Sequence, residues 1–241
     1  MKPISAWLKS LRSGSRPLVF DVGANIGSKT QEFLSAGAKV VCFEPQPACV
    51  DALRQRFRRN HRVVVVPTAL GANKGQAELS ICTDAPTIST LSTTWKAGRF
   101  KDHNWDRTET VPVTTLDAAI EQYGMPFYCK IDVEGFEHPV LTGLTRPIPV
   151  LSFEFCAEGL AQTRPCIDLL DTLGYGAFNI CLGEARTYLM PGAVSATELW
   201  NRLKVLGDPL AWGDIYATTA SRIPDSELLP KLPSRRLNTI N

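Results

Sequence analysis

The sequence lacks a charge bias, a long apolar run and a secretory signal. Its 241 residues carry 26 basic and 24 acidic side chains, so no large basic field is present to attract a nucleic-acid backbone. No run of 18 apolar residues occurs, and the N-terminal 16 residues have no apolar segment followed by a cleavage pattern. We therefore expect a cytoplasmic protein that binds neither nucleic acid nor a membrane.

Paired cysteine motifs are also missing. The chain has seven cysteines, an odd number, and no C-x-x-C pair, which argues against both a disulfide framework and a zinc knuckle. Hydrophobic residues make up 44% and charged residues 21%, as in ordinary globular domains. We expect the cysteines to be small buried side chains of a packed core.

Apolar runs and helical spacings alternate along the chain, which predicts a parallel sheet with right-handed crossovers. Strands are predicted at residues 18–22, 39–43, 63–66, 127–133, 150–155, 176–181, 186–190 and 213–218. Helices are predicted at residues 26–36, 48–59, 116–123, 165–173 and 195–204, with another ending near residue 141. The late strand fits a sheet of seven strands with one antiparallel member. We expect one doubly wound α/β domain over residues 1–220.

Three segments depart from this alternation. Residues 1–16 hold a short amphipathic lead-in helix, and residues 221–241 are proline-rich and predict a partly disordered tail. A strand at 76–82 opens an inserted hairpin, followed by a long polar connection over 83–109. Long connections inside compact domains are often functional, and aromatic residues in this one, such as Trp95, could stack on a substrate. We hypothesise that residues 83–109 form a substrate lid.

The first strand runs into the segment DVGANIG at residues 21–27. Gly23 allows a tight turn, and Gly27 lets the next helix begin close to the sheet, where its free N–H groups favour a negatively charged ligand group. A dinucleotide fingerprint, G-x-G-x-x-G, would need glycine where Asn25 and Ser28 stand. This segment therefore disfavours a pyrophosphate.

Carboxylates follow several of the predicted strands. Asp21 at the end of the first strand would suit a positively charged amino group. Glu44, 23 residues later, can accept hydrogen bonds from two ribose hydroxyls, although it could also be a solvated helix cap. Asp132 and Glu154 end two further strands, so we expect a polar rim around one cleft at this edge of the sheet.

Four motifs occur in the order and spacing of one known family: DVGANIG at 21–27, FEP at 43–45, TLD at 115–117 and KIDVEGFE at 130–137. Together they resemble the FkbM family of S-adenosylmethionine-dependent methyltransferases, over roughly residues 17 to 156. Thr90 stands where the family usually has serine. The resemblance implies a class I methyltransferase fold with strand order 3-2-1-4-5-7-6. It also implies methyl transfer to a hydroxyl oxygen of a sugar, polyketide or similar small natural product.

The resemblance further implies that S-adenosylmethionine is held by seven residues: Asp21, Gly23, Asn25, Gly27, Glu44, Ala69 and Leu70. The loop after the first strand would surround the methionine part. Glu44 would hold the ribose, and Ala69 with Leu70 would lie near the adenine.

Two residues are candidate catalytic groups. The resemblance places Asp132 facing the methyl group, where it could remove or orient the hydroxyl proton. His103 in the long polar segment could be a base delivered by a lid, or simply a solvated loop histidine. Asp132 and Glu154 could together hold Mg²⁺, but two carboxylates on separate strands are thin support, and we expect no metal.

Two other functions are compatible with an α/β fold. An NAD-dependent dehydrogenase or epimerase is disfavoured because the glycine pattern fails and no tyrosine has a lysine four residues after it. A non-catalytic methyltransferase-like binding domain is disfavoured because Asp21, Glu44 and Asp132 are all present. The sequence predicts neither the identity of the acceptor nor the oligomeric state.

Overall fold

The computed structural model describes residues 16–97, 100–185 and 187–220. Seven strands form one sheet in the spatial order β3-β2-β1-β7-β8-β10-β9. Their bounds are Leu18–Val22 (β1), Lys39–Phe43 (β2), Val63–Val66 (β3), Tyr128–Ile131 (β7), Val150–Cys156 (β8), Ala177–Leu182 (β9) and Trp212–Thr218 (β10). Counted along the chain, these strands have the order 3-2-1-4-5-7-6, and β10 is antiparallel to both of its neighbours. The predicted fold class is confirmed.

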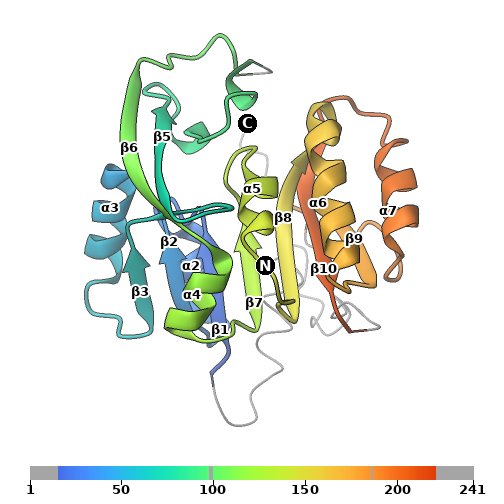
Figure 1. The fold of residues 1–241 in the computed structure, drawn as a ribbon, viewed down its shortest axis with the longest axis horizontal. Coiled ribbons are helices and arrows are strands. Elements are labelled where there is room, and N and C mark those ends of the chain that lie inside the picture. The colour runs from blue at the N-terminus through green and yellow to red at the C-terminus, as the bar shows by residue number, and fades with distance from the viewer. Residues whose placement is uncertain (1–15, 98–99, 186, 221–241) are drawn as a thin grey trace, which may run out of the picture.

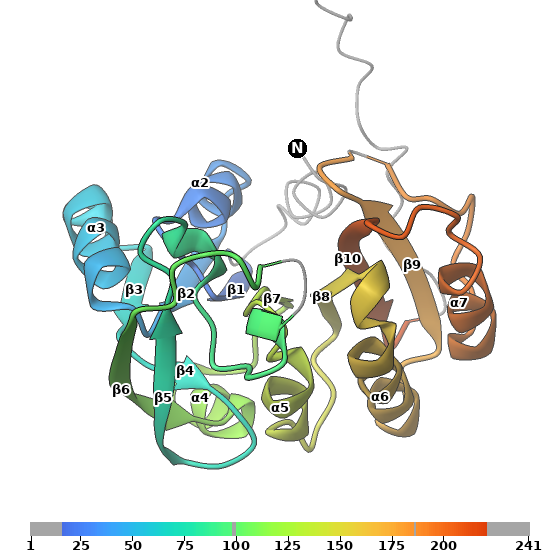
Figure 2. The same cartoon turned by 90° about the horizontal axis from the view of Figure 1, so that it is seen from above.

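Helices cover both faces of this sheet (Figure 1; Figure 2). Their bounds are Ser28–Ser35 (α2), Pro47–Phe57 (α3), Leu116–Tyr123 (α4), Glu137–Thr142 (α5), Leu160–Thr172 (α6) and Ala196–Leu203 (α7). Successive side chains of a strand point to opposite faces, so Val19 of β1 packs against α2 and α3 while Phe20 and Val22 pack against α4 and α5. Because both faces are buried, the central strands have the continuous apolar runs seen in the sequence.

An inserted three-stranded sheet follows β3. It has the order β4-β6-β5 and is formed by Ala69–Leu70 (β4), Gly75–Ile81 (β5) and Arg107–Thr114 (β6). Figure 1 shows β5 and β6 rising beyond the upper edge of the large sheet. The predicted hairpin is confirmed, but β6 begins at Arg107, so the connecting loop spans residues 82–106 and includes two short 3-10 turns, Pro86–Ile88 (η1) and Trp95–Ala97 (η2).

Two predicted elements differ from the structure. No strand forms among the described residues of 186–190. Leu189 donates one backbone hydrogen bond to Ile180. The side chain of Asn179, however, hydrogen-bonds to the backbone N–H and carbonyl of Met190 and to the carbonyl of Gly192. These backbone groups are therefore not available for a continuous ladder between strands. Helix α6 begins at Leu160 rather than at the predicted residue 165. Pro165 therefore lies inside the helix, where it removes a single N–H donor.

The predicted lead-in helix and the tail at 221–241 lie outside the described residues, apart from residue 16 at the edge of the first segment. Within the described ranges, no helix combines the length and apolar character needed to cross a bilayer.

Candidate active site

The loop after β1 is packed directly onto the end of β7. Gly23 has φ +77°, and a Cβ there would lie 1.8 Å from the backbone oxygen of Asp132. The Gly23 N–H donates to the carbonyl of Phe43 at 2.9 Å. Gly27, with φ +83°, precedes α2, and a Cβ there would lie 2.5 Å from the ring of Phe57. Both predicted roles, a tight turn and close helix packing, require glycine at these positions.

A cavity of about 410 Å³ opens beside this loop, and we call it the strand-end cavity. Six of the seven predicted cofactor residues line it, together with Asp132: Asp21, Gly23, Asn25, Glu44, Ala69 and Leu70. The remaining residue, Gly27, is not among the lining residues and acts at the start of α2. The structure therefore brings together residues from the ends of β1, β2, β4 and β7.

Glu44 fixes the shape of this cavity. Its side chain accepts hydrogen bonds from the backbone N–H groups of Asn25, at 2.7 Å, and Gln46, at 2.9 Å. Asn25 has φ 48°, a left-handed conformation that asparagine tolerates better than most residues. Burial raises the pKa of Glu44, and the two N–H donors partly offset this shift. The carboxylate thus connects the loop after β1 to the end of β2.

Asp21 carries an unsatisfied oxygen. Its side chain is only 1% exposed, and one carboxylate oxygen accepts a hydrogen bond from the Thr30 hydroxyl at 2.5 Å. The other oxygen, Oδ1, has no hydrogen-bond partner among the described residues. Burial raises the pKa of Asp21, and the attraction of Lys130 partly offsets this shift. A buried carboxylate oxygen without a donor is costly, and a ligand ammonium would satisfy it. This fits the amino group of S-adenosylmethionine.

Lys130 and Asp132 form an ion pair at the end of β7. Lys130 is 3% exposed. Burial lowers its pKa, but the attraction of Asp132, Asp214 and Asp21 outweighs burial and raises the pKa overall. Lys130 therefore remains charged and orients the Asp132 carboxylate. The ion pair shows that the side chains of Lys130 and Asp132 lie on the same side of the chain at the end of β7.

Three carboxylates converge beyond this pair. Oxygens of Asp132, Glu134 and Glu154 all lie within 4.8 Å of one another. Burial first, and repulsion by Asp132 next, raises the pKa values of Glu134 and Glu154 well above the ordinary range. Such a group could hold a divalent cation, or protons could neutralise it instead. The expectation that no metal is bound remains a prediction.

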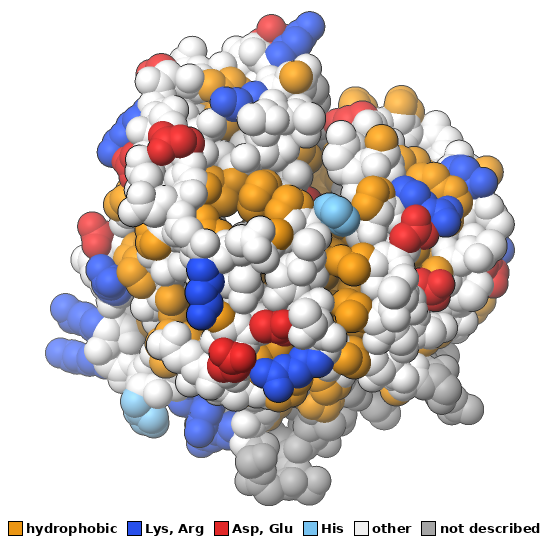
Figure 3. Space-filling view, in the orientation of Figure 1, with side chains coloured by type: hydrophobic (Ala, Val, Ile, Leu, Met, Phe, Trp, Pro, Cys, Tyr) orange, Lys and Arg blue, Asp and Glu red, His pale blue; other side chains and the backbone are white. Residues whose placement is uncertain are grey.

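A second cavity, of about 370 Å³, adjoins the carboxylate group, and we call it the Trp95 cavity. Its walls come from Thr94, Trp95 and Phe100 in the loop 82–106, from Gly135 and residues 137–139, from the end of β8 and from the first turns of α6. The ring of Trp95 covers Gly135, where a Cβ would lie 2.7 Å from the indole. In the space-filling view, the surface is hollowed between the inserted sheet and the α6 side, with hydrophobic side chains around the hollow (Figure 3).

The loop 82–106 borders both cavities. Thr90 and its neighbours line the strand-end cavity, whereas Trp95 and Phe100 line the Trp95 cavity. The Thr90 hydroxyl donates to the backbone oxygen of Glu134 at 2.7 Å, which attaches the loop to the segment after β7. The predicted position of a lid is consistent with this contact, and its opening and closing remain a prediction.

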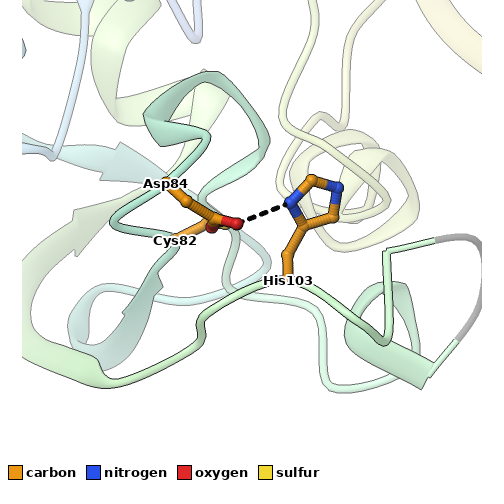
Figure 4. A group of neighbouring side chains, drawn as sticks. All are labelled: Cys82, Asp84 and His103. Atoms are coloured by element: carbon orange, nitrogen blue, oxygen red, sulfur yellow. Dashed lines mark hydrogen bonds and ion pairs between the residues drawn. The ribbon is translucent and has the colours of Figure 1, made fainter.

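His103 is separated from the other candidate residues. Its Nδ1 lies 3.1 Å from Asp84, which also accepts a hydrogen bond from the Cys82 thiol at 3.0 Å (Figure 4). The hydrogen bond from Cys82 is the largest cause that lowers the pKa of Asp84 to about 2. Neither cavity has His103 among its lining residues. The structure does not bring His103 together with Asp132.

Sequence reasoning missed two contributions to the site. Glu134 was not among the predicted site residues, but its left-handed backbone, with φ 55°, places it beside Asp132 and Glu154. The α6 residues of the Trp95 cavity carry no motif. The only available signal for Glu134 was its position between Asp132 and Gly135.

Comparisons with known proteins agree with these motifs. The family model "Methyltransferase FkbM domain" matches residues 21–173. The hexuronic acid methyltransferase AglP of Haloferax volcanii is 28% identical over 138 residues, which cover 56% of this chain and 53% of AglP. The match thus spans only about half the length of that relative.

Two solved structures overlap most of the chain. Precorrin-6y C5,15-methyltransferase of Geobacter metallireducens is 10% identical with a TM-score of 0.47, covering 90% of this chain and 87% of that one. Magnesium protoporphyrin IX methyltransferase of Synechocystis is 11% identical with a TM-score of 0.46, covering 90% and 76%. Both scores lie below 0.5, so neither structure informs the activity of this chain.

Proposed function

This chain belongs to the FkbM family of methyltransferases, and on that premise we propose that it methylates a hydroxyl oxygen of a small molecule such as a sugar or polyketide. The family uses S-adenosylmethionine as its methyl donor. One observation carries the proposal. The strand-end cavity is lined by Asp21, which has an unsatisfied carboxylate oxygen, and by Glu44 and Asp132. The Asp132 carboxylate lies within 4.8 Å of that of Glu154, which lines the second cavity.

The residues of the strand-end cavity fit the parts of this cofactor. Asp21 would accept hydrogen bonds from the amino group of the methionine part. Glu44, already held by two backbone N–H groups, would use its remaining acceptor capacity on the ribose hydroxyls. Buried Ala69 and Leu70 would form an apolar wall for the adenine. When bound, S-adenosylmethionine supplies a methyl group that is already electrophilic because it is attached to a sulfonium.

The main task of the protein is to hold the acceptor oxygen in line with the bond between the methyl carbon and the sulfur of the cofactor. Proximity and orientation can contribute roughly 7–11 kcal/mol, whereas a general base adds about 10²–10⁴-fold, or roughly 3–5 kcal/mol. Asp132 is our candidate base, since it lies between the cavities and Lys130 holds its carboxylate in place. His103 is a weaker candidate because it would first have to leave Asp84.

Two observations support a small, sugar-like acceptor. The name of AglP, a hexuronic acid methyltransferase, supports a sugar-like acceptor, although that similarity covers only half of AglP. The Trp95 cavity, at about 370 Å³, has a size suited to a small molecule.

The test is a calorimetric titration with S-adenosylhomocysteine and, separately, with NAD⁺. We expect micromolar binding of S-adenosylhomocysteine and none of NAD⁺. Glu44→Ala should weaken binding by about 100-fold, which corresponds to roughly 2.7 kcal/mol, because hydrogen bonds to the charged group are lost. Glu121→Ala, at an exposed position on α4, is the matched control and should bind like the parent protein. Binding of NAD⁺ alone would overturn the proposal.

A further inference from the structure

We propose that the side chains of Cys82, Asp84 and His103 bind one Zn²⁺ ion, which ties together the two ends of the loop 82–106. We call these three residues the loop-base cluster. Neither cavity has any of them among its lining residues. The proposed ion site is therefore separate from the site of methyl transfer, and it does not depend on the proposed function.

The loop-base cluster is assembled from the two ends of one loop. Cys82 and Asp84 directly follow β5, and His103 lies shortly before β6. The backbone joins these ends, because the Thr83 N–H donates to the carbonyl of Asn104 at 3.1 Å. The Asn104 N–H in turn donates to the Asp84 carboxylate, also at 3.1 Å. The three side chains are therefore held close together without an ion, which lowers the cost of ordering them around one.

The potential ligand atoms have the spacing that a small ion requires. One Asp84 oxygen lies 3.0 Å from the Cys82 sulfur, and the other lies 3.1 Å from His103 Nδ1 (Figure 4). One ligand atom from each residue lies within 4.8 Å of the other two. Zinc bonds of about 2.0–2.3 Å in a tetrahedron place ligand atoms roughly 3.3–3.6 Å apart. Small side-chain rotations are therefore enough to bring all three atoms into contact with one ion.

The types of ligand favour Zn²⁺ over the hard cations. Thiolate, imidazole and carboxylate are the side-chain ligands of zinc, whereas Mg²⁺ and Ca²⁺ are bound almost entirely by oxygen. The charges also match, since the Cys82 thiolate and the Asp84 carboxylate together balance the two charges of the ion. Within the described residues, one other group of three potential metal ligands occurs, and it contains only carboxylates. A sulfur-to-metal signal therefore reports on Cys82.

Burial places the sulfur on the inner side of the site and leaves the outer side open. Cys82 is fully buried, whereas the side chains of Asp84 and His103 are 41% and 38% exposed. An ion reaches the cluster from this outer side and keeps a water molecule as its fourth ligand, as in other zinc sites with three protein ligands. On binding, the Cys82 thiol releases its proton to solvent as the sulfur–zinc bond forms. The neutral imidazole binds through Nδ1 and carries its proton on Nε2.

The ion would also restrain the part of the loop that reaches the Trp95 cavity. The ring centroid of His103 lies 5.9 Å from that of Phe100, and Phe100 lines the Trp95 cavity. The His103 N–H donates to the Phe100 carbonyl at 3.2 Å. Fixing His103 on an ion therefore stabilises this segment, and amide hydrogen exchange in the loop should slow when Zn²⁺ is present.

The experiment titrates the full chain, first treated with a chelator, with Co²⁺ and then with Zn²⁺. Co²⁺ takes the same ligands as Zn²⁺, and a thiolate ligand gives it a sulfur-to-metal charge-transfer absorption. We expect this absorption to saturate at one ion per chain. Added Zn²⁺ should remove it, because nitrogen and sulfur sites bind Zn²⁺ more tightly than Co²⁺.

Variants connect the signal to the loop-base cluster. Cys82→Ser should abolish the charge-transfer absorption, and His103→Gln should weaken Co²⁺ binding by at least about tenfold. His61→Gln, at an exposed position outside the cluster, is the matched control for His103→Gln and should bind Co²⁺ like the parent protein.

Three results would overturn the proposed ion site. These are no charge-transfer absorption in the folded parent protein, an absorption that persists in Cys82→Ser, and equal Co²⁺ affinity in His103→Gln and the parent. Any of them would leave the cluster as a set of hydrogen bonds only. If Cys82→Ser does not fold, the partly exposed His103 and its His61 control decide the question. Titration of the same samples with S-adenosylhomocysteine tests the proposed function separately.

Discussion

The two cavities lie side by side but are built in different ways. The strand-end cavity is formed largely by residues at the ends of neighbouring parallel strands, where backbone hydrogen bonds fix their positions. The Trp95 cavity is formed by the loop 82–106, whose described residues include two 3-10 turns, by the segment after β7, by the end of β8 and by the start of α6. A sheet edge can therefore specify a cofactor site through a few short motifs, whereas an acceptor site depends on contacts between distant segments.

The comparison predicts that substitutions on the two sides of residues 132–137 have separable effects. Changes at Gly23 or Glu44 should abolish or strongly weaken cofactor binding, and changes in the Trp95 cavity should leave it intact. The shared carboxylate group should affect catalysis and stability.

The largest effect is expected for Gly23→Ala. The new Cβ would lie 1.8 Å from the Asp132 oxygen at a left-handed φ, so β1 and β7 would have to separate. We expect about 4–6 kcal/mol of lost stability and no detectable binding of S-adenosylhomocysteine. Thermal unfolding and calorimetry measure both effects.

Gly176→Ala is the matched control, because a Cβ there would meet no atom within 4 Å. It should leave both the unfolding temperature and the affinity nearly unchanged. If Gly23→Ala has the same unfolding temperature and affinity as Gly176→Ala, the loop after β1 does not approach the end of β7 as closely as described.

Asp132→Asn should lower kcat by about 10²–10⁴-fold once an acceptor is known, because the base that takes the hydroxyl proton is lost. Binding of S-adenosylhomocysteine should change by no more than roughly threefold, since Asp21 and Glu44 remain. Steady-state kinetics combined with calorimetry separates the two effects. Full kcat on the true substrate would exclude Asp132 as the base.

Trp95→Leu tests the second cavity separately from the first. It removes the indole from the wall of the second cavity, and Trp95 is not a lining residue of the first. We expect a loss in kcat/KM of about tenfold or more, with the affinity for S-adenosylhomocysteine unchanged. An equal loss in both quantities would show that the cavities are not separable.

The smallest effect is expected for Glu154→Gln on stability. The pKa of Glu154 is raised in the folded state, so the folded chain holds its proton more tightly than the unfolded chain. Stability should therefore fall as pH rises from the unfolded pKa, near 4.3, towards the raised folded value. Glu154→Gln should remove this loss and raise Tm at pH 8 by about 2–4 °C, or roughly 1 kcal/mol. If the difference in Tm between pH 5 and pH 8 is the same in Glu154→Gln as in the parent protein, the raised pKa of Glu154 is wrong.

The features predicted correctly from the sequence are those that depend on local periodicity and strand ends. Apolar runs located the seven strands of the sheet, and strand-end positions placed Asp21, Glu44 and Asp132 together. The glycine roles were also predictable, because only glycine allows both the positive φ and the close approach at Gly23.

The features that were missed depend on tertiary contacts. The segment before residue 190 has a strand-like pattern, but the Asn179 side chain occupies the backbone groups that a ladder would use. His103 was a candidate base because of its residue type and its position in a long polar loop, and its contact with Asp84 depends on how that loop folds. The convergence of Glu134 with Glu154 requires a left-handed residue that no local pattern specifies.

A crystal structure of the full chain with S-adenosylhomocysteine tests the central claim most directly. The account predicts the amino group on Asp21 Oδ1, the ribose hydroxyls on Glu44 and the sulfur facing Asp132, with the Trp95 cavity left open to an acceptor. A complex in which the adenosine occupies the Trp95 cavity, or in which Asp21 and Glu44 do not contact the ligand, would contradict it.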